Sequence, residues 1–407
     1  MSRIVRVALL LAIVALMLVS AYTILAFMRS DAALDRGDPA AALRARPDNP
    51  EALMQLADER LAVGDMPKVE VLAKRLLASS PAEGRGYRLL AQVSESRGEY
   101  ARAEKLYAIA AQRAPRDLQA RAWLAQRALA AGNYPLALQH IDQVLRTSPG
   151  SHARLFPVLI QFSQDVDFAD AVAKAMTSHP EWREGLLSAL LDPVTGNPLA
   201  ADHVLAGLQR RRDLDAVTTQ AWIEALMHQG RWGSAFARWA GPHVASGRAL
   251  PLLFNGDFTS TPEGSGFDWR LPPVAGVLVA IEPNGSAGML HVRFLGRRVS
   301  GGPVVSHALM LTPGKYRLTW RERIDAMRAG IGVAWRISCD GQSQSLLEAE
   351  PSNGTRPWRD QTSTFTVPAD RCGGQWLELT GSGNAGAGQI VSGDLWYSDM
   401  GLTKVMK

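Results

Sequence analysis

The sequence predicts a multi-domain protein in which α-helices precede β-strands. The expected order is an N-terminal transmembrane helix, an α-solenoid and a C-terminal antiparallel β-sandwich of the jelly-roll type. Three observations predict this order: residues 7–28 carry no charge, prolines recur every 34 residues at Pro81, Pro115 and Pro149, and short β-branched and aromatic runs follow Pro251. A chain of 407 residues with 47% apolar composition is long and apolar enough for more than one hydrophobic core.

The uncharged segment 7–28 follows a short tail, residues 1–6, that contains Arg3 and Arg6. Its 22 residues, at about 1.5 Å each, match a hydrocarbon core about 30 Å thick. We therefore expect a single-pass membrane anchor. The alternative is a cleaved signal peptide, because Val19-Ser20-Ala21 has the small-residue form of a cleavage site. The apolar run continues to Phe27, which favours the anchor.

Two sequence features disagree about the side of the membrane on which the bulk of the chain lies. Four arginines follow the apolar segment: Arg29, Arg36, Arg44 and Arg46. They outnumber the two arginines that precede the apolar segment, and this count alone would place the bulk of the chain in the cytoplasm. Cys339 and Cys372 are the only cysteines and predict one disulfide in an oxidising compartment, with two reduced thiols as the alternative. We expect an inner-membrane protein with the bulk of its chain in the periplasm.

The 34-residue period continues around each proline. The unit ending at Pro115 contains Tyr87, Leu90, Ala91, Gly98, Tyr100, Ala103, Tyr107 and Ala110. Small alanines let two helices approach, glycine permits the turn and proline ends the second helix. This pattern resembles the tetratricopeptide repeat. Residues 49–150 hold three such units, 151–250 a degenerate continuation, and 29–48 read as a partly helical stalk.

Stacked hairpins of this kind form a groove lined by the first helix of each pair, which commonly binds an extended peptide or a helix of a protein partner. The repeat frame predicts a mixed polar lining with one aromatic ring: Arg85, Arg88, Gln92, Gln119, Trp123 and Gln126. The alternative is an ordinary solvated helix face.

The region 251–407 has strand-like runs about ten residues apart, which is typical of a sandwich. It opens with Leu253-Phe254-Asn255-Gly256-Asp257-Phe258, contains Leu311-Thr312-Pro313-Gly314-Lys315-Tyr316, and closes with Asp394-Leu395-Trp396-Tyr397-Ser398-Asp399. These segments resemble carbohydrate-binding modules of the galactose-binding-like class. The resemblance implies a structural calcium ion held by Asp257 and Asp399. The alternative is a turn at Asp257 and a surface cap at Asp399.

Glycan binding by such a domain needs an exposed aromatic ring. Four tryptophans lie in strand-like runs and are expected between the sheets: Trp320, Trp335, Trp376 and Trp396. Trp358 lies in a turn-like segment and, with Arg356 and Arg359, is the predicted glycan-recognition patch. The alternative is a simple loop anchor.

Other functions lack support in the sequence. A net charge of +5 without a basic stripe argues against nucleic-acid binding. The eight histidines show no metal-ligand spacing, and no phosphate-binding loop, nucleophile elbow or dinucleotide fingerprint occurs. Scattered carboxylates leave a glycoside-active enzyme as a less favoured alternative.

We therefore expect a binding protein, not an enzyme, with no cofactor apart from the calcium that the resemblance implies. The order of parts resembles accessory factors of surface-polysaccharide assembly or export in Gram-negative bacteria, and predicts an envelope scaffold with a protein partner and a polysaccharide partner. A purely protein-binding adaptor with a β domain that binds no glycan is the alternative.

Overall fold

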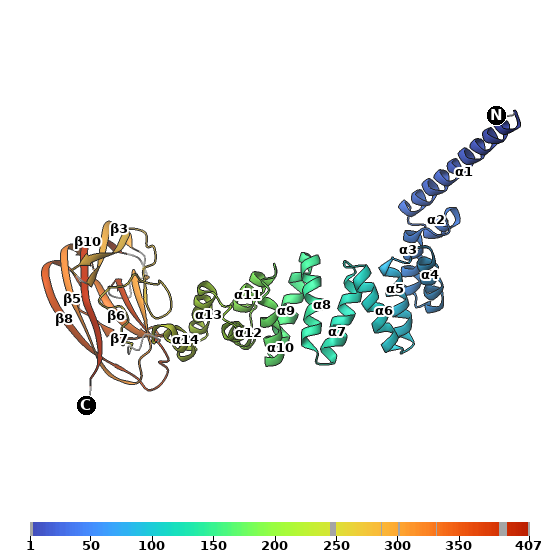
Figure 1. Ribbon diagram of the computed structural model, residues 1–407. Coiled ribbons are helices and arrows are strands. Elements are labelled where there is room, and N and C mark those ends of the chain that lie inside the picture. Colours follow the sequence, from blue (N-terminus) through green and yellow to red (C-terminus); the bar gives the residue numbers. More distant parts are fainter. Residues whose placement is uncertain are drawn as a thin grey trace. The chain divides into compact units, whose positions relative to one another are not determined.

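The computed structural model describes residues 3–244, 250–285, 287–299, 302–330, 332–381 and 389–405 (Figure 1). Part of the predicted tail, Met1 and Ser2, lies outside these ranges. The chain forms two compact units, Met1–Asp213 and Leu214–Lys407. Helices precede strands, as the sequence predicts, with fourteen α-helices and ten strands in the described part of the chain.

Helix α1, Arg3–Asp35, contains the apolar segment. Within its portion Leu11–Asp35, the most apolar window of 18 residues has a mean hydropathy of 2.4 and is not buried against the rest of the chain. Among the described residues this is the one helix long and apolar enough to cross a membrane, a property shared by anchors and signal sequences.

The segment expected to be a stalk is packed. α1 continues to Asp35 and meets α2, Pro39–Ala45, and the start of α3 through the buried Ala33, Ala42 and Ala52. The hydroxyl of Ser30 donates to the carbonyl of Ala42 at 3.2 Å, and the amide of Asn49 donates to Ser30 at 2.8 Å. The last turns of α1 therefore form the first layer of the helical unit.

Six helices follow: α3 Pro50–Ala62, α4 Met66–Ser79, α5 Gly84–Ser96, α6 Tyr100–Arg113, α7 Leu118–Ala130 and α8 Tyr134–Thr147. They pair as antiparallel hairpins, α3 with α4, α5 with α6 and α7 with α8. Gly64, Gly98 and Gly132 end the first helix of each pair at φ of 74°, 74° and 70°, a left-handed conformation that glycine adopts readily. Ala91 and Ala103 are fully buried where α5 meets α6.

The remaining helices of the first unit are η1 Pro149–Ser151, α9 His152–Phe162, α10 Val166–Met176, α11 Arg183–Leu191 and α12 Pro198–Arg210. The second unit begins with one more hairpin, α13 Ala216–His228 and α14 Trp232–Val244. The boundary between compact units thus differs from the helix-to-strand change expected near Pro251. Residues 245–249 lie outside the described ranges.

The strands form a sandwich of two five-stranded antiparallel sheets. Their bounds are β1 Trp269–Arg270, β2 Val277–Asn284, β3 Ala287–Val299, β4 Val305–Leu309, β5 Gly314–Ala329, β6 Val333–Cys339, β7 Ser345–Glu348, β8 Gly354–Val367, β9 Gln375–Gly381 and β10 Gln389–Lys404. The first sheet has the order β1-β4-β9-β6-β7 and the second β2-β3-β10-β5-β8. Trp269, Trp335 and Tyr397 lie in the core between them.

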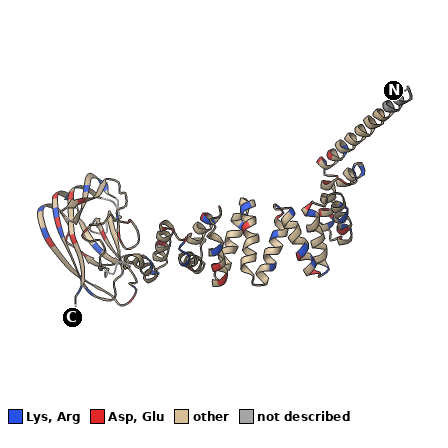
Figure 2. Ribbon diagram, in the orientation of Figure 1, with Lys and Arg blue, Asp and Glu red and all other residues tan. Residues whose placement is uncertain are grey.

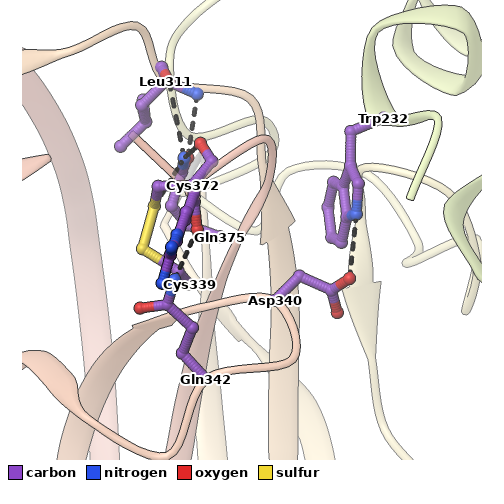
Figure 3. Close-up of a disulfide and its surroundings, with 8 residues drawn as sticks. Trp232, Leu311, Cys339, Asp340, Gln342, Cys372 and Gln375 are labelled. Atoms are coloured by element: carbon purple, nitrogen blue, oxygen red, sulfur yellow. Dashed lines mark hydrogen bonds between the residues drawn. A yellow bond between two sulfur atoms is a disulfide. The ribbon is translucent and has the colours of Figure 1, made fainter. Parts of the chain in front are cut away.

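The hairpin α13–α14 packs on the sandwich through an aromatic contact. The indole of Trp232 donates to one carboxylate oxygen of Asp340 at 3.1 Å (Figure 3). The indole of Trp376 donates to the other carboxylate oxygen at 3.0 Å. The two tryptophan rings meet edge to face at 5.3 Å. The guanidinium of Arg270 in β1 donates two further hydrogen bonds to the carboxylate of Glu224 in α13, at 2.8 and 2.9 Å.

The predicted disulfide is confirmed and lies beside this contact. Cys339, at the end of β6, is bonded to Cys372 in the loop that precedes β9. The buried side chain of Gln375 crosses behind it and exchanges hydrogen bonds with the backbone of Leu311, at 2.9 and 3.4 Å (Figure 3). The disulfide thus joins the turn that carries Asp340 to the loop that carries Gly374.

Gly374 has no room for a side chain, because a Cβ atom there would lie 1.8 Å from Cδ2 of Trp232. We predict that Gly374→Ala destabilises the second unit by about 2 kcal/mol through overpacking. Gly373→Ala is the matched control, since nothing lies within 4 Å of its added methyl group, and should change stability by less than about 0.5 kcal/mol. Urea unfolding followed by tryptophan fluorescence measures both; equal effects would contradict a tight contact.

Candidate functional site

The predicted groove residues lie on the first helices of two neighbouring hairpins. Arg85, Arg88 and Gln92 belong to α5, and Gln119, Trp123 and Gln126 belong to α7. A hollow of about 660 Å³ opens between these helices, lined by Glu83, Arg85, Arg88 and residues 114–119. Three of the six predicted residues, Arg85, Arg88 and Gln119, therefore line one concave site.

Arg88 forms the buried wall of this hollow. Its side chain is 7% exposed, and its guanidinium donates to Asp117 at 2.9 Å, to Gln119 at 2.8 Å and to Gln92 at 3.2 Å. Asp117 in turn accepts hydrogen bonds from the amides of Gln119 and Ala120 and so caps α7. Arg88 thereby fixes the start of α7 against α5, and its charge is engaged within the chain.

Trp123 is also engaged within the chain. Its indole donates to Glu95 at 2.8 Å, and the hydroxyl of Tyr107 donates to the same carboxylate at 2.9 Å. The two rings stack with centroids 4.5 Å apart. Burial, followed by the hydrogen bond to Glu95, raises the pKa of Tyr107. Trp123 is thus held inside the hairpin layer, while Gln126 is exposed outside the hollow.

Sequence reasoning missed Arg116, which lines the hollow from the turn between α6 and α7. Among the described residues no acidic group lies within 4.0 Å of its guanidinium, whereas Arg85 is paired with Glu83 at 2.9 Å and Glu51 at 3.1 Å. The sequence feature that could have identified Arg116 is its position directly after Pro115, in the turn that precedes α7. Arg116 presents an exposed positive charge at the mouth of the hollow.

We predict that Arg88→Met destabilises the helical unit by roughly 3 kcal/mol, because the largely buried carboxylate of Asp117 loses its charged partner. Arg85→Met is the control: the Arg85 side chain is 38% exposed, so its loss should cost less than about 1 kcal/mol. Urea unfolding followed by far-ultraviolet circular dichroism measures both variants. A loss from Arg88→Met no larger than the control's would contradict the buried-wall role.

The outer face of the second sheet carries a stack that the sequence did not predict. Trp396 of β10 is paired directly with His291 of β3 and with Arg323 of β5. The imidazole lies parallel to the indole at 4.5 Å, and the guanidinium lies 4.2 Å from the ring centroid. The expectation that Trp396 lies between the sheets is wrong, because its strand neighbours Leu395 and Tyr397 occupy the core.

Trp376 also departs from that expectation, since it contacts Trp232 on α14 and is partly exposed. Trp320 and Trp335 lie in the core between the sheets, as predicted. Strand periodicity identifies two faces of a strand, but it does not say which face meets the other sheet.

Charged groups surround the Trp396 stack. The imidazole nitrogens of His291 lie 2.6 Å from Glu282 and 2.6 Å from Asp394, and Arg293 donates to Asp394 at 2.7 Å. Although partial burial opposes it, the hydrogen bonds from Arg293 and His291 lower the pKa of Asp394. Figure 2 shows basic and acidic residues interspersed along strands of the sandwich. The carboxylate of Asp394 is therefore ionised at neutral pH, and the face around Trp396 is polar.

Trp358 lies in β8, an edge strand, and not in a turn. Its partly buried ring has the guanidinium of Arg321 5.6 Å from its centroid, and Arg321 pairs with Asp360 at 3.2 Å. Arg356 lies 3.9 Å from Glu350, and Arg359 is exposed. The pairing with β5 shifts register between Arg356 and Arg359. Their role in glycan recognition stays a prediction.

Asp257 and Asp399 do not fit a calcium site. Asp257 accepts two hydrogen bonds from Thr259, at 3.1 and 3.3 Å, as a local turn does. Asp399 accepts from Ser398 and lies 3.8 Å from the guanidinium of Arg321, which would repel a cation. Calcium prefers six to eight oxygen ligands, and the described residues contain no group of three or more histidine, cysteine or acidic side chains placed to hold a metal.

No family model matches this chain, and no curated protein matches it either. Solved structures match its parts. The helical part is similar to YrrB, described as a TPR protein with an unusual peptide-binding site, at 10% identity and a TM-score of 0.30 over 46% of this chain and 91% of that one. PilF of Pseudomonas aeruginosa matches at 14% identity and a TM-score of 0.29, over 55% of this chain and 98% of that one.

The C-terminal part is similar to a CBM4 carbohydrate-binding module, at 12% identity and a TM-score of 0.29 over 38% of this chain and 99% of that one. The two halves of the chain are thus matched by tetratricopeptide-repeat proteins and by carbohydrate-binding modules, respectively. At these identities and scores, any ligand must be inferred from the residues of this chain.

Proposed function

We propose that this chain is a membrane-anchored scaffold of the cell envelope that binds a protein partner through its helical unit, without catalysis. The observation that carries the proposal is the hollow between α5 and α7. Its wall is fixed by the ion pair of Arg88 and Asp117, and Arg116 at its mouth has no acidic partner within the part of the chain that the structure describes. A rigid wall lowers the entropic cost of ordering a bound peptide. The free guanidinium favours a partner segment that carries a carboxylate.

Selection of peptides from a display library on the full chain tests this proposal. We expect acidic peptides to be enriched, and Arg116→Ser to weaken their binding about fivefold, as for one partly exposed ion pair. Arg154→Ser removes an exposed arginine of α9 that does not line the hollow and should leave binding unchanged. No enrichment of acidic peptides, or an equal loss in both variants, would refute the peptide site.

A second function, glycan binding, is favoured by the outer face of the second sheet. Trp358 is partly exposed there, Arg321 and Arg323 lie on the neighbouring strand β5, and Arg293 lies on β3 of the same sheet, beyond β5 and β10. Both faces of Trp396 are covered by His291 and Arg323, whereas Trp358 has one guanidinium, that of Arg321, 5.6 Å from its ring centroid, so Trp358 is the ring better placed to stack on a sugar. Guanidinium groups bind carboxylates in pairs of hydrogen bonds. These features suit an anionic polysaccharide better than a neutral one.

A glycan array probed with the full chain separates the two functions. We expect binding to uronate-containing glycans that falls at least about tenfold in Trp358→Ala, because an aromatic anchor commonly dominates such a site. Arg371→Gln, in the exposed loop beside the disulfide, is the control and should bind normally. An array with no bound glycan would leave the chain as a purely protein-binding adaptor.

The proposed location is the inner membrane, crossed once by α1, with both units in the periplasm. The apolar helix and the disulfide between Cys339 and Cys372 support it. A tethered chain that joins a protein-binding groove to a glycan-binding sheet would serve as an accessory factor in surface-polysaccharide assembly or export.

A further inference from the structure

α1 and α2 enclose a groove of about 460 Å³ that straddles the C-terminal end of the apolar segment. Tyr22 and Leu25 form its apolar end, and Arg29, Arg36 and Arg44 line the remainder, with alanines between them. Tyr22, Arg29 and Arg36 follow one another at seven-residue spacing and so share one face of the helix. The groove is therefore apolar at one end and cationic at the other.

The position of this groove along α1 matches the boundary of a membrane. The uncharged run ends at Met28, so Arg29 is the first charge after it. At about 1.5 Å per residue, Tyr22 lies about 10 Å on the apolar side of Arg29 and Arg36 about 10 Å on the other side. Tyrosine is enriched where hydrocarbon meets headgroups, and arginine beyond it.

The arginines of the groove are not neutralised by the chain. No acidic residue lines the groove, and neither Arg29 nor Arg36 has an acidic group within 4.0 Å among the described residues. Arg44 lies 4.0 Å from Asp38, but these side chains are 73% and 52% exposed, so solvent screens the pair. Arg46 lies 3.9 Å over the ring of Phe27 and adds positive charge at the same level.

We propose that this groove binds the headgroup of an anionic phospholipid, with its phosphate on Arg29, Arg36 and Arg44 and its acyl chains along Tyr22 and Leu25. Guanidinium groups match phosphate oxygens in charge and geometry. The inference rests on the proposed membrane anchor. It also gives the arginines that follow the apolar segment a role outside the cytoplasm, although their number alone favours the opposite orientation.

Native mass spectrometry of the full chain in detergent, titrated with phosphatidylglycerol or phosphatidylcholine, tests this site. We expect the chain to prefer phosphatidylglycerol, and the triple variant Arg29→Gln, Arg36→Gln, Arg44→Gln to lose at least about tenfold in affinity, since each arginine contributes about fivefold near an anionic surface. The matched control Arg75→Gln, Lys105→Gln, Arg154→Gln removes three exposed positive charges elsewhere and should keep the preference.

Equal binding of the two lipids, or an equal loss in the control, would overturn the site. Displacement of phosphatidylglycerol by millimolar inorganic phosphate would also overturn it, because the groove would then be a site for soluble anions. An alkaline carbonate wash of membranes tests the anchor separately. Release of the unmodified chain contradicts the anchor, whereas retention together with unselective lipid binding contradicts only the lipid site.

Discussion

The disulfide between Cys339 and Cys372 is the constraint on which the second unit depends. It holds the turn of Asp340 next to the loop of Gly374, and Trp232 of α14 packs between them. The bond closes a loop with a sequence separation of 33 residues, which would stabilise the fold by roughly 3–4 kcal/mol in the chain-entropy account. The last helical hairpin is thereby part of the β domain, and a fragment cut at Pro251 would uncover Trp376.

The helices and turns of the repeats could be predicted from the sequence, because they depend on residues close together along the chain. Gly64, Gly98 and Gly132 mark turns at a fixed period, and the helices between them follow from residue spacing. The packing of α13–α14 depends on Trp232 meeting Gly374, residues 142 positions apart, and no local pattern records such a contact. The same limit explains the position of Trp396: alternation along β10 is visible, but the choice of face follows from sheet pairing.

The candidate sites show a related limit. Arg88 and Gln119, which the repeat frame assigns to one groove, both line the same hollow, but the repeat frame does not reveal that Arg88 is buried and paired with Asp117. Ion pairs between neighbouring helices neutralise Arg85 and Arg88, whereas Arg116 has no acidic group within 4.0 Å among the described residues, and this difference depends on the three-dimensional packing. On the second sheet, pairing of β3, β10 and β5 likewise assembles His291, Trp396 and Arg323, which are far apart in sequence.

The oxidation state of Cys339 and Cys372 in the native cell shows whether this chain is an envelope scaffold with a covalently locked β domain. Cells are denatured in the presence of a thiol-reactive mass tag, with or without prior reduction, and the mass of the full chain is measured. A disulfide-bonded chain should carry no tag without reductant and two tags after reduction, since Cys339 and Cys372 are the only cysteines. Two tags without reductant would show a reducing compartment and contradict the envelope scaffold.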